Sequence, residues 1–341
     1  MSQTVMTARA SFSRSVRGAV VGAVLLTLAP SLARCQISPQ LTDEIRSGIA
    51  NRIEALTILG GDFGLSAGHL TSRGTLLPGQ GSSSVESDVT KGGGDGDVGD
   101  PQPLGDLDIG WQPRLQGNMG YLNSTNQPTS GLLAGDKSEV TTYAIEFGGG
   151  ARFWLSDRLS VAPTLMGLYG DTSNSYTVRS AFMKANLSRA IELGLVDWRI
   201  KTWTLRPALN VQYVVAVNRA IITLSSDPTF FYTRGFNSSN SNVRINGDSG
   251  ALANKIDVDV PLGIEIFGHE LRSGGYLTRT ELLGDLRSGL EVQHINEIHG
   301  RLVLDFLQQL WKVQWLGVGA SYLWGTDIRG WTAGVDVAFR F

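Results

Sequence analysis

Cysteine is almost missing from this chain, because Cys35 is the only one in 341 residues. No disulfide can therefore form within it. Beyond Cys35 there is no stretch of about 18 uncharged apolar residues, which excludes a membrane-spanning helix in that part of the sequence. A basic excess is missing too, since Lys+Arg 29 stand against Asp+Glu 31. This balance argues against a nucleic-acid partner, which would require clustered positive charge.

The first residues have the pattern of a secretory signal peptide. Arg9, Arg14 and Arg17 precede an apolar run over residues 18–29, and small residues follow it. The run is too short to span a bilayer. We therefore assign residues 1–35 to a signal peptide, with cleavage before Arg34 or before Gln36. Arg34 stands where a lipobox needs a small residue, so Cys35 is not expected to carry a lipid.

Alternation of apolar and polar residues dominates the chain after about residue 100. From Trp331 to Phe341 it has no exception, with the apolar residues on one face and Asp336 and Arg340 on the other. About eleven residues is the length that a tilted strand needs to cross a bilayer. Several alternating segments exceed ten residues, whereas strands in soluble sandwiches average about 5–6. The pattern predicts an all-β fold, a transmembrane antiparallel barrel over residues 61–341.

The strand count and the loops follow from the same pattern. Ten segments are clear, and weaker ones around residues 65–75 and 118–123 bring the number to twelve, an even number as in bacterial barrels. The Gly-, Ser- and Asp-rich segment 80–103 has no period and predicts a mobile loop. Short turns are expected near residues 156–157, 197–201, 267–270 and 307–311. Long polar loops are expected near residues 124–138, 170–179, 219–251 and 284–289.

The polar face of these strands is the candidate functional surface, because on the barrel interpretation it lines the lumen. It mixes acids and bases, which predicts weak ion selectivity if the pore is open. Glycines on the same face, such as Gly148 and Gly150, would leave room inside. The expected lumen-lining residues are Glu146, Arg152, Arg206, Asp257, Asp259, Glu265, Glu297, His299, Arg301, Asp305, Asp336 and Arg340.

Residues 36–60 predict an amphipathic helix. Apolar residues recur at intervals of three or four, namely Leu41, Ile45, Ile49, Ile53 and Leu56. Such a helix can plug the lumen or lie on the inner-leaflet surface. The plug is favoured because an apolar stripe is normally buried against protein.

Motifs that suggest chemistry are weak. Gly64-Leu65-Ser66-Ala67-Gly68 matches the nucleophile-elbow pattern, but a helix precedes it and a strand follows, which is the wrong context. His299 beside Glu297 suggests a general base without an obvious nucleophile. Asp95, Asp97 and Asp100 do not have the spacing of a calcium loop. We expect no catalytic residue, no metal and no cofactor.

Three features carry a resemblance to a known family. They are the helix at residues 41–56, the hairpins around Tyr143–Tyr169 and Trp203, and the final Gly334-x-x-Val337-x-Phe339-x-Phe341. With them the chain resembles the solitary autotransporter-like barrels of the outer membrane. The resemblance implies a twelve-stranded barrel with the amino-terminal helix threaded through its lumen. It also implies that Gly334, Val337, Phe339 and Phe341 form an assembly signal. No passenger is expected between signal peptide and helix, so self-secretion is not expected.

The sequence thus predicts a monomeric, non-enzymatic barrel in the outer membrane of a Gram-negative bacterium, of translocator type and with a helix in its lumen. Its expected partners are outer-membrane lipid and the barrel assembly machinery. An open porin-like channel for small solutes and an outer-membrane hydrolase using His299 or Ser66 are the alternatives.

Overall fold

The structure, a computed structural model, describes residues 65–74, 83–105, 107–290, 292–310 and 313–339. The predicted signal peptide and the helix of residues 36–60 lie outside the described residues, as do Arg340 and Phe341. The strands are β1 Leu65–Gly74, β2 Ser83–Asp97, β3 Gln102–Leu104, β4 Leu107–Asn126, β5 Lys137–Trp154, β6 Leu159–Thr177, β7 Arg199–Val217, β8 Ala220–Phe236, β9 Asn246–Ile266, β10 His269–Gly284, β11 His294–Leu310, β12 Val313–Gly325 and β13 Ile328–Phe339. The described helices are α3 Ala181–Glu192 and α4 Asp285–Leu290.

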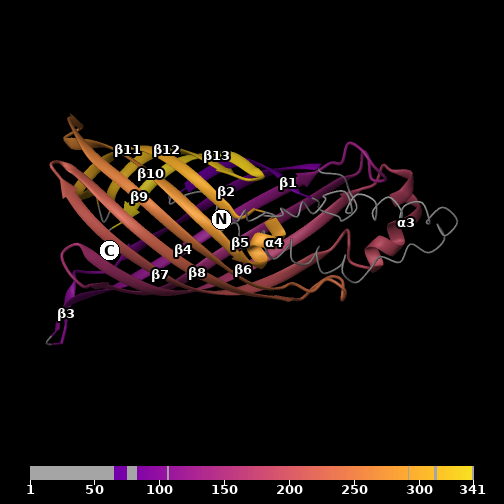
Figure 1. The fold of residues 1–341 in the computed structure, drawn as a ribbon, viewed down its shortest axis with the longest axis horizontal. Helices are drawn as coiled ribbons and strands as arrows, with labels where there is room; N and C mark the ends of the chain where they lie inside the picture. The colour runs from indigo at the N-terminus through magenta and orange to yellow at the C-terminus, as the bar shows by residue number, and fades with distance from the viewer. Residues whose placement is uncertain (1–64, 75–82, 106, 291, 311–312, 340–341) are drawn as a thin grey trace, which may run out of the picture. The chain divides into compact units, whose positions relative to one another are not determined.

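The strands close into one antiparallel barrel (Figure 1). Neighbours in sequence pair with each other, β1 pairs with β13, and β2 pairs with both β1 and β4. The three-residue β3 pairs only with β4 and is not one of the strands that form the barrel wall. The other twelve strands confirm the predicted fold and strand number.

Two of the predicted strand assignments were wrong although their number was right. The supposed mobile loop 80–103 contains β2, paired on both sides. Glycines 92–94 have no side chain to place on either face, so the segment shows no period, yet its backbone completes two hydrogen-bonded ladders. The segment 118–123 is no separate strand, because β4 runs without a break from Leu107 to Asn126.

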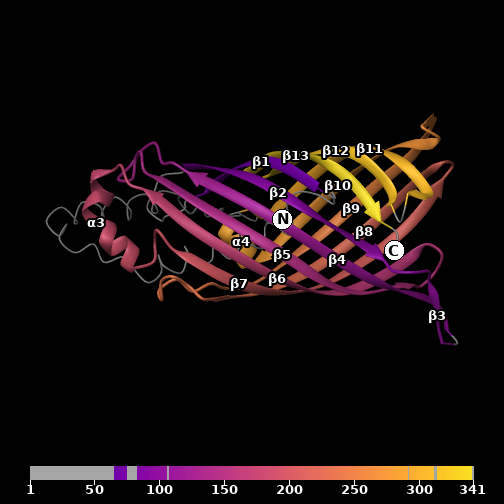
Figure 2. The same cartoon turned by 180° about the vertical axis from the view of Figure 1, so that it is seen from behind.

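The predicted alternation of turns and loops was wrong in two places. The turn expected at 197–201 is the end of a long connection that holds α3, followed by β7 from Arg199. The loop expected over 219–251 contains all of β8, and the real turn is Asn218-Arg219. Asn218 has φ +55°, a left-handed conformation that asparagine tolerates better than most residues. The end of the barrel with short turns also holds the end of β13, and α3 lies at the opposite, loop end (Figure 2).

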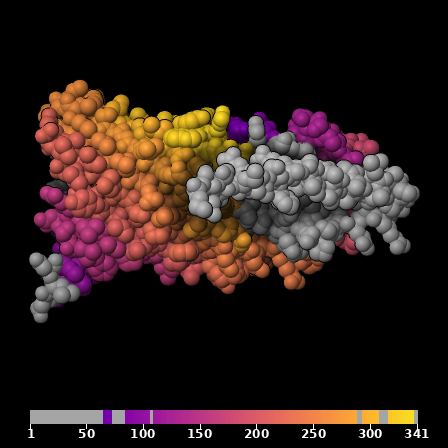
Figure 3. Space-filling model, viewed as in Figure 1, coloured from indigo at the N-terminus to yellow at the C-terminus, as the bar shows by residue number. Residues whose placement is uncertain are grey.

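The outward face is mostly apolar from β4 to β13, whereas that of β2 carries Glu86, Asp88 and Thr90. The apolar side chains of this face are exposed, among them Phe147, Leu165, Trp203, Ile256, Ile298, Leu302, Val318 and Trp331. Figure 3 shows one side of the outer surface that the strands form. Exposed apolar side chains on neighbouring strands around most of the barrel require an apolar solvent, which is the hydrocarbon core of a bilayer.

Glycines at inward positions allow neighbouring strands to approach closely. A Cβ built on Gly150 would lie 1.9 Å from the carbonyl oxygen of Pro163 on β6, and one on Gly148 would lie 2.2 Å from that of Leu165. These contacts are with backbone, which cannot swing aside. The glycines therefore permit the strong coiling of β5 against β6, a reason different from the room for a helix that the sequence suggested.

Candidate functional site: the barrel lumen

The turn-side half of the lumen holds charged side chains paired across strands. On β5, Glu146 accepts hydrogen bonds from Arg206 Nε of β7 at 2.5 Å and from Asn118 Nδ2 of β4 at 2.8 Å. Arg152, also on β5, lies 2.9 Å from Asp97 of β2 and donates to Gln212 of β7. Only 2% of the Glu146 side chain and 12% of the Arg206 side chain are exposed. These groups link the wall from β2 to β7.

A second network lies on β9 to β13. Arg301 forms two hydrogen bonds with Asp257, at 2.9 and 3.0 Å, and lies 3.9 Å from Asp336. Arg272 likewise forms ion pairs with Asp259, at 3.1 Å, and with Asp305, at 4.0 Å. Each guanidinium thus lies between two carboxylates from different strands. The acids and bases of the lumen neutralise each other locally, and this arrangement leaves no long corridor of one charge.

A small buried cluster on β10 to β12 lies next to these pairs, on the side of the loop end. Tyr276 donates a hydrogen bond to Glu297 at 2.9 Å and stacks on His299, with ring centroids 4.5 Å apart. The Nδ1 of His299 lies 2.9 Å from the hydroxyl oxygen of Ser321. Sequence reasoning missed Ser321, because only the register of β11 with β12 brings it opposite His299.

The remaining predicted site residues that the structure describes are Glu265, Gly334, Val337 and Phe339. Glu265 is exposed and faces Glu270 just after a register irregularity in the β9–β10 ladder. Gly334 and Val337 lie in β13, where Gly334 pairs with Ser66 of β1 and Gly319 of β12. Phe339 ends β13. Arg340, Phe341 and the five apolar residues of the expected plug helix lie outside the described residues.

At the loop end the polarity of the lumen changes. Several inward positions there are apolar and buried, and they form one contiguous core with α4, whose Leu286 is 0% exposed. Inward positions of β5 to β8 at this end also include buried threonines, such as Thr142 and Thr172. We call this cluster the outer core. It comprises Leu70, Val89, Leu122, Phe231, Ala251, Leu282, Leu286, Val292, Ile295, Leu323 and Ile328. Its strand members come from β1, β2 and β4 and from β8 to β13, and none comes from β5, β6 or β7, so the core lines that part of the ring at the loop end.

The outer core was not predicted from the sequence. Its signal is visible in retrospect as apolar residues in the polar phase near the loop end of a strand, such as Phe231 within Thr229–Thr233 and Leu282 after Thr280. The outward face changes in the opposite sense at the same level. It turns polar at Asn123, Thr141, Asp171, Lys201, Arg234, Arg279, Asn296 and Arg329.

The loops beyond the outer core are tied together by one carboxylate. Asp136, fully buried, accepts hydrogen bonds from the backbone N–H groups of Arg179 and Ser180, from the Ser180 hydroxyl and from the Tyr176 phenol. Burial alone would raise the pKa of Asp136, but these four donors hold it below its usual value. Ser180 also caps α3 by accepting from the Met183 N–H.

The residues of the weak catalytic and metal-binding motifs do not come together in one site. Ser66 is buried on the inward face of β1, whereas His69 is on the outward face, 2.9 Å from Asp88 of β2. Asp95 and Asp97, expected in a solvated loop, form ion pairs with Arg114 on β4. Among the described residues, no group of three or more His, Cys, Asp or Glu side chains is arranged to hold a metal ion. No described helix has the length and apolar character to cross a bilayer.

A closed twelve-stranded barrel with an apolar outer belt and a charged lumen defines the class, an integral barrel of the outer membrane of Gram-negative bacteria. Residues 103–333 match the family described as the solitary outer membrane autotransporter beta-barrel domain, and the chain belongs to that family. The family and the localisation predicted from the sequence are confirmed. No curated protein matched the chain.

Two solved structures are similar to this chain. The transport unit of the autotransporter AIDA-I from Escherichia coli has a TM-score of 0.53 at 10% identity, covering 87% of this chain and 99% of that one. The translocator domain of the autotransporter NalP from Neisseria meningitidis has a TM-score of 0.47 at 12% identity, covering 90% and 100%. At this identity the first likeness supports the fold alone.

Proposed function

We propose that this protein is a closed, translocator-type structural barrel whose extracellular mouth is held shut by its own outer core. The observation that carries the proposal is the burial of the outer core, whose apolar side chains gather around Leu286 of α4 at the loop end. Since short turns face the periplasm and long loops face the exterior, this core lies at the extracellular end. An apolar section offers an ion no ligands in place of its water shell, and a narrow apolar section does not hold water.

The helix of residues 36–60 has a subordinate role in this proposal. We keep the lumen as its proposed place, as its apolar stripe suggests. The seal itself is assigned to the barrel and not to the helix. This proposal therefore predicts that the pore stays closed when the helix is removed.

Conductance of the refolded barrel in planar bilayers tests this assignment. Four proteins are compared: the mature chain, the chain without residues 36–60, Phe231→Ser with Leu282→Ser, and Phe230→Ser with Leu283→Ser. The third opens the outer core, since both residues are buried in it. The fourth is the matched control, because it changes the same residue types on the same strands at outward, exposed positions.

Only the outer-core variant is expected to conduct steadily. Steady conductance of the unmodified chain would instead identify an open diffusion channel. If deletion of residues 36–60 opens the pore while the outer core is intact, the helix is the plug and the core is not.

The barrel is also proposed to lack an enzyme site. Ser66 and His69 are on opposite faces of one strand, and His299 and Ser321 are 6% and 4% exposed beneath the outer core, away from bulk solvent. Esterase and phospholipase assays of the refolded chain should give no turnover. Turnover that disappears with Ser321→Ala or with Ser66→Ala would assign a hydrolase instead.

The remaining proposals concern partners. We propose a monomer, surrounded by outer-membrane lipid, that the barrel assembly machinery recognises through Gly334, Val337, Phe339 and Phe341. Replacement of Phe341 by serine is expected to slow insertion into the outer membrane without changing the stability of the protein once folded. Unchanged insertion kinetics would remove Phe341 from the signal.

A further inference from the structure

One outward-facing site lies at the level where the barrel leaves the membrane. On β7, Trp203 is the last apolar outward residue and Lys201 the first polar one. On the neighbouring β8 the same boundary falls between Tyr232 and Arg234. The rings of Trp203 and Tyr232 have centroids 5.6 Å apart, as expected of aromatic residues at a membrane interface. Lys201 is therefore at the height of the head groups of the outer leaflet.

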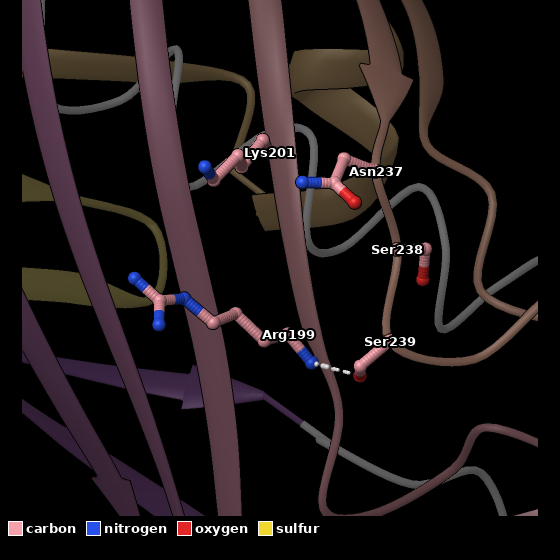
Figure 4. A pocket seen from close by; sticks show the side chains of 5 residues that line it. All are labelled: Arg199, Lys201, Asn237, Ser238 and Ser239. Carbon is pink, nitrogen blue, oxygen red and sulfur yellow. Dashed lines mark hydrogen bonds between the residues drawn. The ribbon is translucent and has the colours of Figure 1, made fainter.

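A pocket of about 300 Å³ opens at this level (Figure 4). It is lined by Arg199, Lys201, Asn237, Ser238 and Ser239, from the start of β7 and the chain that follows β8. Three of these side chains already have partners. Arg199 binds Asp171 through two hydrogen bonds, Ser239 accepts from the Arg199 N–H, and Ser238 donates to the carbonyl of Asn240.

Lys201 and Asn237 differ from the other three. Neither side chain makes a hydrogen bond or an ion pair with any residue that the structure describes, and both line the same pocket (Figure 4). Asn237 has φ +48°, a left-handed conformation that fixes its position at the end of β8. The residues that line the pocket thus supply an ammonium group, an amide and the guanidinium of Arg199, which is already bound to Asp171.

We propose that this pocket binds a phosphate group of the lipopolysaccharide that forms the outer leaflet, at its phosphorylated glucosamine head. Cationic and amide N–H donors are the groups that bind phosphate oxygens on sugars. The aromatic rings of Trp203 and Tyr232, on the membrane side of the pocket, offer an apolar surface to the acyl chains and the sugar. Asp171 lies directly opposite Lys201 on the ladder but is neutralised by Arg199. A negative ligand therefore meets a net positive site.

Binding of bisphosphorylated lipid A to the refolded, detergent-solubilised chain tests the proposal. Affinity is measured by thermophoresis for the unmodified chain, for Lys201→Gln and for Lys184→Gln. Lys184 is the control, an exposed lysine on α3 at the same end of the barrel but outside the pocket. Loss of one charge-assisted contact should weaken binding about 10-fold in Lys201→Gln and leave the control unchanged. Heat modifiability on gels verifies that all three proteins are folded.

The ligand is varied as well as the protein. Fully dephosphorylated lipid A should bind about 10-fold more weakly than the bisphosphorylated form, if the phosphate is the group recognised. Equal affinity for both lipids, or equal affinity of Lys201→Gln and the unmodified chain, overturns the proposal. If inorganic phosphate at millimolar concentration displaces lipid A through Lys201, the site is one for free phosphate and the assignment to lipid is wrong.

Discussion

Arg206 and Glu146 form an ion pair that crosses a whole strand. The Nε of Arg206, on β7, donates to Oε1 of Glu146, on β5, at 2.5 Å, while β6 lies between them. Both side chains point into the lumen, and Asn118 of β4 contributes a second donor to the same carboxylate. The pair and Asn118 therefore join β4, β5 and β7 through side chains, and the link from β5 to β7 passes over β6.

Replacement of Arg206 by alanine should lower the stability of the folded barrel. The carboxylate of Glu146 would keep Asn118 but lose its counter-charge in a buried site, at a cost on the order of 3 kcal/mol. The urea midpoint of the heat-modifiable band measures the effect. Arg189→Ala is the control, because the Arg189–Glu192 pair on α3 is exposed and worth less than about 1 kcal/mol. Equal midpoints for the two variants would show that lumen water replaces Arg206.

Val211→Arg should impair insertion. Val211 is an outward position of β7 between Leu209 and Tyr213, within the apolar belt. An arginine near the bilayer midplane costs about 2–4 kcal/mol. The amount of folded protein in the outer membrane, scored by heat modifiability, is the readout. Ser175→Arg places the same residue on an outward position of β6 above the belt and should accumulate normally. Equal accumulation of both variants would contradict the assignment of the outward face.

Asp136→Asn should loosen the loops around α3 without opening the barrel. The amide retains one acceptor but turns its NH₂ group towards the Ser180 and Tyr176 hydroxyls, which costs about 1–3 kcal/mol locally. Hydrogen exchange of residues 178–198 at pH 7 should be faster than in the unmodified chain. Asp157→Asn, at the exposed β5–β6 turn, is the control and should leave this exchange unchanged.

The same carboxylate predicts a pH dependence. Because the folded pKa of Asp136 is held below its usual value of 3.8, its ionised form stabilises the loops above that pH. This contribution falls away as the pH drops from the ordinary value through the lower folded pKa. After correction for the intrinsic rate, protection of residues 178–198 should decrease in that acidic window. In Asp136→Asn the decrease should be absent. A similar decrease in both proteins would assign the effect to another group.

Gly150→Ala should destabilise the barrel, whereas Gly300→Ala should not. A methyl group on Gly150 meets the Pro163 carbonyl at 1.9 Å, so the β5 and β6 backbones must separate, at a cost of about 1–3 kcal/mol. Gly300 faces outward from β11 with nothing within 4 Å of its added Cβ. Urea midpoints of the two folded variants compare them directly. A neutral Gly150→Ala would mean that the ladder relaxes at no cost.

Local patterns in the sequence determined the class of fold. Alternation along residues 203–217 and 331–337 depends only on the two faces of a strand, so it predicted which side chains meet lipid, and the structure agrees. The strand number also came out right, although the strand Ser83–Asp97 was taken for a loop. Glycine carries no information about faces, so a glycine-rich strand is recognised only by its partners.

Tertiary structure alone decided how the lumen is used. Leu70, Phe231 and Leu282 lie far apart in the sequence and share no local period, and only closure of the barrel brings them into one outer core. The pairing of Arg206 with Glu146 depends on the register of β5, β6 and β7 together. The sequence specifies which face of a strand is polar because that property is local. Which polar or apolar groups then meet depends on how neighbouring strands are staggered around the ring, and no single strand contains that information.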